Sequence, residues 1–458
     1  MGFGVVIGTG DYPKGAPDGT QDASGKPLGG RMSYLIDIMR QTELAGSQKP
    51  SQTASMQKHK TALRAALLLA ATGLTLSACY DSGSEPYSED DFLSNKPPQF
   101  VLLAFDGSSS LNFWKESLAF AQTAAARGAP LKFTYFASGP YFTPDAKKST
   151  YIAPGKGPGK SDIGFGGTDA TIALRYEQLN AAAAAGHEIG SHANGHFDGS
   201  RWTVEQWTSE FDQFNTLMFT APHPGAPVSL TKPRDVVGFR APLLANNPAL
   251  YTVLAAKGFT YDTSKVAKPD YWPEKIGGVW NFPLASLNIV GSGKRTLSMD
   301  YNFYVADSRG VADPAKKAVY KKQMIDTYRA YFLSNYNGNR APVHIGHHFS
   351  KWNGGAYWEA MQEFALEVCG KPNVRCGTYK ELVAFMETRT PAQLADYRRR
   401  AFTGAEEILD VVDPARGVGD LPQHIEAPAA HSDEAEPEQP TTYPVQPMQL
   451  TPSRASGF

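Results

Sequence analysis

Two histidines four residues apart, His192 and His196, are candidate metal ligands. Imidazole suits Zn²⁺, Co²⁺ and Ni²⁺, and two rings at this spacing can approach one ion from a helix or a tight turn. A solvated turn is the alternative explanation for the same pair. Catalytic zinc sites add a third protein ligand and keep one position open for water. Asp106 is the candidate third ligand, although Asp106 and Gly107 also fit an ordinary turn.

Four further polar residues could take part in the same chemistry. Arg240 follows an apolar run and precedes Ala-Pro, which is an unusual place for a surface arginine. Its guanidinium could hold a carboxylate through two hydrogen bonds. Asp262 could join the site or simply cap the turn that follows it. His347 and His348 are adjacent, and either imidazole could act as a general acid.

Each of these polar residues lies at the carboxyl end of a predicted buried strand. The apolar or β-branched runs that predict strands are residues 99–105, 131–138, 187–191, 235–239, 259–262 and 341–346. Helical patterns separate them at residues 114–127, 174–185, 321–335, 356–368 and 380–388, with two more helices starting at Thr203 and Asn247. Alternating strands and helices predict an α/β fold with a parallel sheet or barrel. The polar residues should therefore converge at the carboxyl rim of that barrel.

The segment from Met56 has the pattern of a secretory signal. A basic start is followed by a mostly apolar stretch, and Leu76-Ser77-Ala78 precedes Cys79. Small residues before a cysteine resemble the lipobox of bacterial lipoproteins, which implies a lipid on Cys79 and a membrane anchor. An ordinary buried helix is the alternative. We expect an exported protein held at the cell envelope, in the periplasm or at the outer membrane.

The domain organisation predicted from these patterns has five parts. They are a mis-annotated or disordered extension (1–55), a signal peptide (56–78), a tether (79–97), a folded domain (98–395) and a disordered acidic, proline-rich tail (396–458). Apart from Cys79, to which the lipid is assigned, the chain contains Cys369 and Cys376. These two cysteines could form a disulfide in an oxidising compartment.

Composition excludes several function classes. The chain has 458 residues, with 44 Lys and Arg against 45 Asp and Glu, so no basic excess indicates nucleic acid as a partner. No apolar run reaches the ~18 residues of a membrane span. The 3 cysteines are too few for a disulfide scaffold or a four-cysteine zinc site. We expect a monomer.

Five motifs occur in an order that resembles the polysaccharide deacetylase (NodB-homology) family, especially its chitin-deacetylase-like branch. They are FDG (105–107), GHEIGSHANGH (186–196), FRAP (239–242), GFTYDTS (258–264) and APVHIGHH (341–348). The resemblance covers nearly the whole predicted domain. It implies an irregular (β/α) barrel, a divalent metal held by one Asp and two His, and hydrolysis of acetyl groups on polysaccharides. Zinc is the expected metal, with cobalt or nickel as alternatives.

The resemblance also implies a role for each matched residue. His192 and His196 match the two metal histidines, and Arg240 matches the arginine that orients the catalytic base. His348 takes the place of the general acid, with His347 as the alternative. Asp106 would take a proton from the attacking water, and His348 would protonate the leaving sugar amine.

The first motif departs from the family pattern Thr-Phe-Asp-Asp-Gly, whose first Asp is the base and whose second is a metal ligand. This chain has Ala-Phe-Asp106-Gly107-Ser108. Without a gap, Asp106 is the base and Gly107 replaces the ligand; with a one-residue deletion, Asp106 is the ligand and the base is lost. The position of the preceding Phe favours the ungapped match. Water, Ser108 or Asp198 could supply the missing ligand.

The sequence thus predicts a metal-dependent hydrolase that removes acetyl groups from a chitin-like or peptidoglycan-like polysaccharide. A catalytically impaired, carbohydrate-binding pseudoenzyme is the first alternative, and a structural envelope lipoprotein is the second. Five tryptophans could line a sugar groove, although we expect most of them in the core: Trp202, Trp272, Trp280, Trp352 and Trp358.

Overall fold

The computed structural model describes residues 96–399 and 401–402. The predicted extension, the signal peptide, Cys79, most of the tether and nearly all of the acidic tail lie outside the described residues. No helix in the described ranges combines the length and apolarity that crossing a membrane requires.

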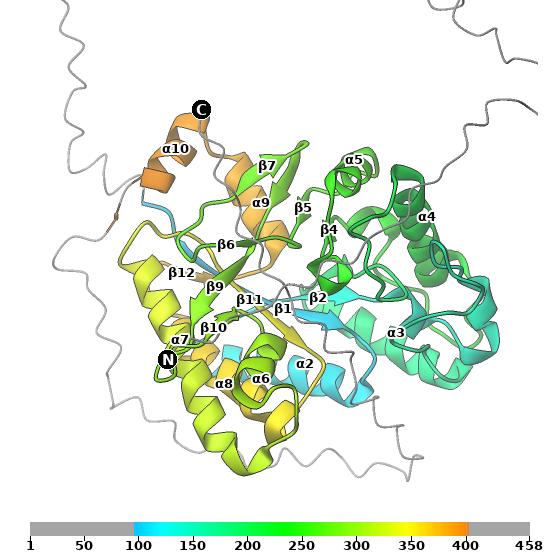
Figure 1. The fold of residues 1–458 in the computed structure, drawn as a ribbon, viewed down its shortest axis with the longest axis horizontal. Helices are drawn as coiled ribbons and strands as arrows, with labels where there is room; N and C mark the ends of the chain where they lie inside the picture. Colours follow the sequence, from blue (N-terminus) through cyan, green and yellow to red (C-terminus); the bar gives the residue numbers. More distant parts are fainter. Residues whose placement is uncertain (1–95, 400, 403–458) are drawn as a thin grey trace, which may run out of the picture. The chain divides into compact units, whose positions relative to one another are not determined.

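The described residues form an α/β domain around one large sheet (Figure 1). Its strands run in the order β11-β1-β2-β3-β4-β5-β8-β7, with β12 also paired to β1. Their bounds are β1 Gln99–Gly107, β2 Phe133–Ala137, β3 Glu188–Ser191, β4 Gly238–Phe239, β5 Tyr261–Asp262, β7 Glu274–Ile276, β8 Val279–Asn281, β11 Val343–His348 and β12 Val374–Cys376. All pairs are parallel except β7 with β8, as the alternating pattern predicts.

A second, smaller sheet makes the barrel irregular. It contains β6 (Val266–Ala267), β9 (Leu284–Asn288) and β10 (Arg295–Leu297), in the order β10-β9-β6. A single parallel bridge between Met299 and Gly346 connects the segment after β10 to β11. The large sheet therefore curls into an open barrel, which confirms the predicted fold class.

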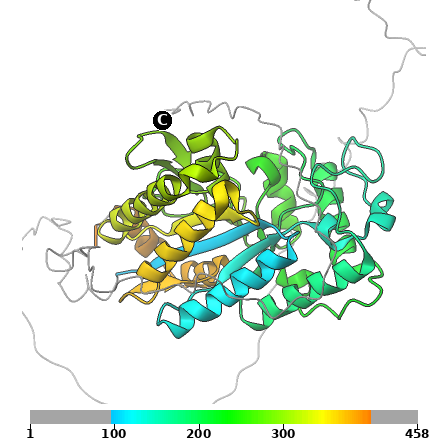
Figure 2. The ribbon, with the colours of Figure 1, turned by 90° about the horizontal axis from the view of Figure 1, so that it is seen from below.

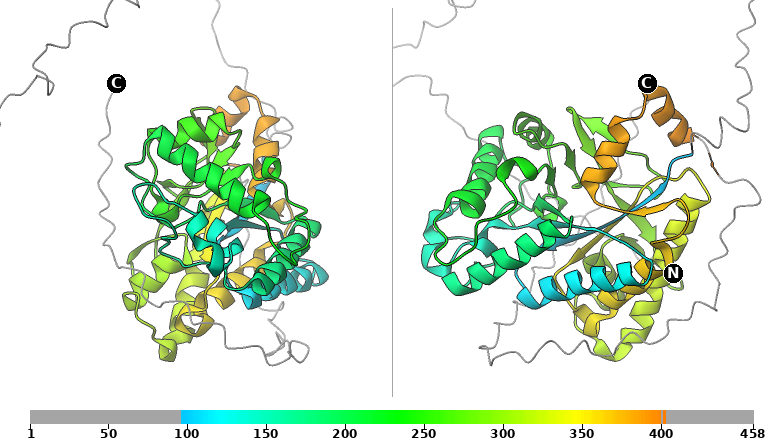
Figure 3. Two further views of the ribbon diagram at one scale, coloured as in Figure 1. Left: turned by 90° about the vertical axis from the view of Figure 1, so that its right-hand side faces the viewer. Right: turned by 180° about the vertical axis from the view of Figure 1, so that it is seen from behind.

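The helices lie between the strands in the predicted alternation. They are α2 Leu111–Ala126, α3 Asp169–Ala184, α4 Val204–Asn215, α5 Pro248–Ala256, α6 Asp300–Ser308, α7 Lys317–Tyr336, α8 Trp352–Val368, α9 Tyr379–Glu387 and α10 Pro391–Arg399. Figure 2 shows α2 (cyan) and α8 (yellow) along the central strands, and α2 and α3 pack side by side (Figure 3). Of these helices, α6 and α10 are absent from the sequence prediction.

Local capping explains where several helices begin. Thr203 and Gln206 form a capping box at the start of α4, and Thr378 with Glu381 forms another at α9. Asn247 caps α5, whose first residue is a proline. A side-chain cap stabilises a helix by about 1 kcal/mol, so these starts are readable from sequence. In contrast, α6 follows Met299 without any side-chain cap, which explains why its start was missed.

Strand β1 separates two buried cores. Val101, Leu103 and Phe105 pack into the core beneath α2, α7 and α8. The alternate residues Leu102 and Ala104 belong to a second cluster inside the curled sheet. A strand buried on both faces reads as a continuous apolar run, as β1 does. Asp106 has the phase of the inner residues, so its side chain belongs to the interior of the barrel.

The packed region extends past the predicted boundary at residue 395. Tyr397 in α10 is 1% exposed and its ring lies 4.8 Å from that of Trp272; Phe402 is 2% exposed. The predicted disulfide between Cys369 and Cys376 is confirmed, and it links the end of α8 to β12.

Candidate functional site

A buried ion pair lies at the carboxyl end of β1. Arg240 donates a hydrogen bond from Nη1 to Oδ1 of Asp106 over 2.8 Å. Asp106 is 4% exposed and Arg240 is fully buried. The two residues come from β1 and from the segment just after β4, so the parallel sheet brings them to the same rim.

Three further contacts fix the Arg240 guanidinium. Its Nε donates to Oγ1 of Thr263 over 2.6 Å, and Nη2 donates to the hydroxyl of Tyr379 over 3.3 Å. Its Cζ lies 4.7 Å from the centre of the Phe136 ring. A planar guanidinium with this many directed contacts has one orientation, which in turn orients the Asp106 carboxylate.

Asp106 remains a carboxylate at neutral pH. Burial by itself raises its pKa, but nearby positive charge, above all that of the Arg240 guanidinium, outweighs burial and holds the pKa below its usual value. A buried, ionised carboxylate held by an arginine can accept a proton from a water molecule.

His348 lies opposite Asp106 in the parallel register of β1 and β11. Its backbone N–H donates to Oδ2 of Asp300 over 2.9 Å, and its Nδ1 donates to Oδ1 over 2.7 Å. Burial lowers the pKa of His348, but the Asp300 and Asp106 carboxylates raise it above its usual value. An imidazolium whose Nδ1–H is fixed in this way has Nε2–H left as its proton donor.

Asp300 is the functional residue that the sequence argument missed. It is 1% exposed and begins α6, and it lies 48 positions before His348. The sequence signal available for it is its place in the segment SMDYNF (298–303), directly after a short strand.

His347 belongs to the other face of β11. Its Nε2 lies 3.3 Å from the hydroxyl of Tyr328, and its ring packs 6.3 Å from that of Phe105 in the core beneath the helices. Burial lowers its pKa to about 4, so the ring is neutral at pH 7. Alternation along the strand therefore places His348, and not His347, on the face that carries Asp106.

His192 and His196 are brought together at the end of β3. Their ring centres are 5.4 Å apart, and His192 Nδ1 donates to the carbonyl oxygen of Arg240 over 2.8 Å. Burial lowers the pKa of His192, and burial together with His192 lowers that of His196 to about 3. Both rings are therefore neutral, and His192 presents Nε2 as the atom that could bind a metal.

Among the described residues, the structure brings together the two histidines of the ligand set that the resemblance implies. Two neutral imidazoles suit a divalent ion, but in the described residues no group of three His, Cys, Asp or Glu side chains is placed to hold one. Asp106 is engaged by Arg240, and Asp198 is exposed and accepts a hydrogen bond from the N–H of Ser200. Within residues 96–399 and 401–402, the histidines thus fit a metal as a pair of donors.

The remaining sequence candidates have structural roles. Asp262 is fully buried and accepts hydrogen bonds from Tyr251 and Ser264, so it caps the turn after β5. This turn includes Thr263, which supports Arg240. Three of the five tryptophans are buried in the core: Trp272, Trp280 and Trp358. Trp352 is partly exposed and its ring lies 5.3 Å from that of His348, whereas Trp202 packs 4.7 Å from Trp207.

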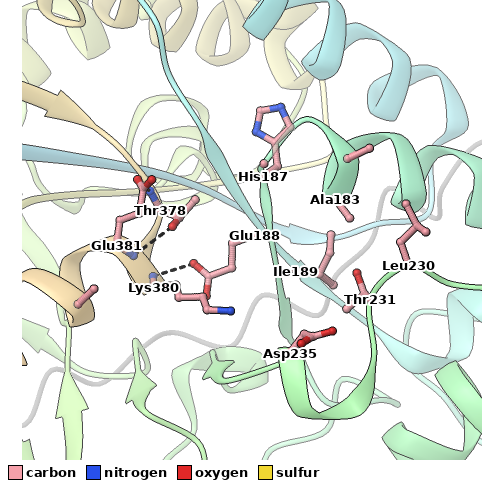
Figure 4. A pocket seen from close by; sticks show the side chains of 13 residues that line it. Ala183, His187, Glu188, Ile189, Leu230, Thr231, Asp235, Thr378, Lys380 and Glu381 are labelled. Atoms are coloured by element: carbon pink, nitrogen blue, oxygen red, sulfur yellow. Dashed lines mark hydrogen bonds between the residues drawn. The ribbon is translucent and has the colours of Figure 1, made fainter.

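The pocket drawn in Figure 4 lies at the opposite end of β3 from this site. It is lined by residues at the end of α3, the start of β3 and the start of α9, among them His187, Glu188 and Lys380. The Glu188 carboxylate accepts hydrogen bonds from Tyr261, Thr134 and the N–H of Lys380. Because the pocket is lined by the start of β3, whereas the two histidines follow the end of β3, it is separate from the candidate site.

Comparisons with known proteins give similarity at the level of the fold. No protein-family model and no curated protein matches the chain. Among solved structures, the chain is similar to a candidate polysaccharide deacetylase from Mycobacterium smegmatis, at 18% identity over 65% of this chain and 93% of that chain, with a TM-score of 0.39.

Two further solved structures match at lower identity. A family 4 carbohydrate esterase from Streptomyces lividans, in complex with acetate, matches at 14% identity over 61% of this chain and 92% of that chain, with a TM-score of 0.32. A CE4 family pseudoenzyme from Bacillus anthracis matches at 9% identity over 62% and 66%, with a TM-score of 0.35. The similar structures thus include proteins described as enzymes and as a pseudoenzyme.

Proposed function

We propose that this protein is a hydrolase that removes acetyl groups from an N-acetylated polysaccharide of the chitin or peptidoglycan type. The observation that carries the proposal is the pairing of Asp106 with His348 at the ends of adjacent strands, each held by its own buried partner of opposite charge. This pairing places one ionised carboxylate and one proton-donating imidazole at the same rim, as amide hydrolysis requires.

The reaction follows from these two groups. Asp106 accepts a proton from a water molecule as the water oxygen forms a bond to the acetyl carbonyl carbon. His348 donates the Nε2 proton to the sugar nitrogen as the carbon–nitrogen bond breaks, which releases acetate and the free amine. Arg240 and Asp300 keep the two groups oriented and in the required protonation states. A zinc-type ion, bound to His192 and His196, would supply a water of lower pKa.

Acetate release tests this proposal. The purified protein is incubated with acetylated chito-oligosaccharides and with peptidoglycan fragments, after chelation and again after addition of Zn²⁺, Co²⁺ or Ni²⁺. We expect Asp106→Asn to remove turnover, because an amide cannot accept the proton. Asp270→Asn is the matched control, since Asp270 is half-exposed and pairs with Lys268 at the surface. Equal rates for Asp106→Asn and the unmodified protein would refute the mechanism.

A second function is favoured by one specific observation. Because the described residues lack a third metal ligand beside the histidines, the protein could bind an acetylated glycan without hydrolysing it. Calorimetric titration with the same oligosaccharides separates the two functions. Glycan binding without acetate release, at every metal tested, would establish the pseudoenzyme; acetate release that disappears in Asp106→Asn would exclude it.

We further propose that the protein is an exported lipoprotein attached to the cell envelope through Cys79. The signal-like segment before Cys79 and the disulfide between Cys369 and Cys376 support this location. Labelled fatty acid should be incorporated into the full chain and lost in Cys79→Ser. An unmodified N-terminus upstream of Met56 in the exported protein would contradict the proposal.

A further inference from the structure

The loop that carries the two histidines has an unfavourable backbone. Ala193 has φ +53° and His196 has φ +60°, so two residues with side chains adopt the left-handed region within one short segment. Each such residue costs about 1–2 kcal/mol and persists only where neighbouring contacts hold it. The loop therefore needs external support, and the structure shows where that support comes from.

Glu210, on α4, contacts this loop directly. It is 1% exposed, and its Oε1 accepts a hydrogen bond from the backbone N–H of Asn194 over 3.0 Å. Its backbone carbonyl accepts a second one from Nδ2 of Asn194 over 2.8 Å. Both hydrogen bonds are to Asn194, which lies between His192 and His196 in the sequence.

Tyr151 extends the contact to the next loop residue. Its hydroxyl donates to the Glu210 carboxylate, 3.0 Å from Oε1, and accepts a hydrogen bond from the N–H of Gly195 over 3.0 Å. A Cβ on Gly195 would lie 2.8 Å from that hydroxyl, so only glycine allows this approach. Tyr151 is fully buried, as the hydroxyl at the centre of such a network must be.

Two carbonyl oxygens of the loop accept hydrogen bonds from the backbone of other segments. The N–H of Gly139 donates to the carbonyl of Ala193 over 3.1 Å, and the N–H of Asp162 donates to that of Gly195 over 2.9 Å. The N–H of Ala193 donates to Oγ of Ser191 over 3.2 Å. The side chains of Glu210 and Tyr151 thus accept the N–H donors of Asn194 and Gly195, and replacing either side chain frees one of these donors without removing the rest of the support.

We propose that Glu210 and Tyr151 are positioning residues that set the relative placement of His192 and His196. This proposal rests on the proposed function in one respect, namely that His192 and His196 bind the same metal ion. Neither residue touches the histidine rings in any contact described above; both act through Asn194 and Gly195. Glu210→Gln keeps the acceptor and should preserve the arrangement, whereas Glu210→Ala and Tyr151→Phe should loosen it.

Zinc affinity and amide exchange test the proposal together. We expect Tyr151→Phe and Glu210→Ala to weaken Zn²⁺ binding about 10–100-fold, as loss of an outer partner of a metal ligand does, and Glu210→Gln to restore it. Tyr176→Phe is the matched control, because it also loses a buried hydroxyl, one that donates to the Met218 carbonyl away from the loop. It should lower thermal stability similarly while leaving zinc affinity unchanged.

Hydrogen exchange at the amides of Asn194 and Gly195 separates this proposal from the proposed function. If the unmodified protein binds no zinc, the metal part of the proposed function fails. Amide exchange alone then tests whether Tyr151 and Glu210 position the loop. Faster exchange in Tyr151→Phe than in Tyr176→Phe would support that role. Unchanged exchange and unchanged zinc affinity in Tyr151→Phe would overturn it. Should Glu210→Ala fail to fold, Tyr151→Phe carries the same decision.

Discussion

Asp106 and His348 each depend on one buried partner of opposite charge. Arg240 holds the first and Asp300 the second, and all four side chains meet at the rim of the barrel. Removing one member of a buried pair leaves an unpaired charge and costs about 3–5 kcal/mol, so truncation to alanine would confuse folding with function. Isosteric changes that remove charge but keep shape are the informative ones at this scale.

The first prediction concerns the pKa of His348. In Asp300→Asn the neighbouring negative charge is lost, so the pKa of His348 falls. A general acid works in its protonated form, so the rate falls as pH rises through that pKa. The alkaline limb of kcat/KM should therefore move to lower pH. Asp307→Asn, on the same helix, is the control; a lower rate with an unmoved limb would show that His348 is not the acid.

The second prediction concerns stability and Glu210. Burial raises the pKa of Glu210 to about 7 from an ordinary 4.5, so its contribution to stability is complete below about pH 4.5 and is lost as pH rises through 7. The free energy of unfolding should fall by about 3 kcal/mol between pH 5 and 8 relative to Glu210→Gln. Urea titrations at several pH values measure this, and parallel curves for the two proteins would contradict it.

At the scale of elements, short segments after strands position the site. The turn after β5 places Thr263 against Arg240, and the start of α6 places Asp300 against His348. The end of β1 differs from its neighbours, because Gly107 has φ +99° and Ser108 has φ +127°. The position that the resemblance assigns to a metal ligand thus has a backbone conformation that favours glycine.

The third prediction tests position 107. A Cβ there would meet no atom closer than Cε2 of Tyr141 at 4.0 Å, so a side chain fits in space but not in backbone conformation. Gly107→Ala and Gly107→Asp should both lose about 1–2 kcal/mol of stability in the presence of chelator. Zinc titration should show tighter binding by Gly107→Asp than by Gly107→Ala. Equal zinc affinities of the two variants would show that a carboxylate at position 107 does not bind a metal held by the two histidines.

At the scale of the whole molecule, the two ends of the barrel have different tasks. The carboxyl ends of β1, β3 and β11 carry the candidate site. At the other end, β12 pairs with the first residues of β1, and the disulfide links β12 to the end of α8. In parallel barrels the amino end serves stability and the carboxyl end carries the chemistry. A change at the disulfide should therefore affect folding and leave the reaction intact.

The fourth prediction follows from this separation. Replacing both Cys369 and Cys376 by serine should lower the free energy of unfolding by about 2–3 kcal/mol, because the unfolded chain loses a closed loop. Acetate release per folded molecule should stay within about twofold of the unmodified protein. Denaturant titration and initial rates measure the two quantities, and a large loss of rate in the folded variant would show that the ends are coupled.

The sequence by itself determined the features that depend on local pattern. Apolar runs, helix caps and glycine stops predicted most of the strands and helices in order, and the polar residue after each strand predicted that Asp106, His192, Arg240 and His348 would share one rim. These predictions succeed because a parallel sheet converts position along the chain into position in space. The metal ligand set and the assigned catalytic roles stay predictions.

Only the tertiary structure decided which residues pair. Asp106 and Arg240 are 134 positions apart, and His348 and Asp300 are 48 apart, so no local pattern connects them. The choice between His347 and His348 depended on which face of β11 is covered by helices. Packing likewise produced three other features, because contacts between segments distant in sequence stabilise each of them. They are the small sheet beside β11, the left-handed histidine loop and the support of that loop by Glu210.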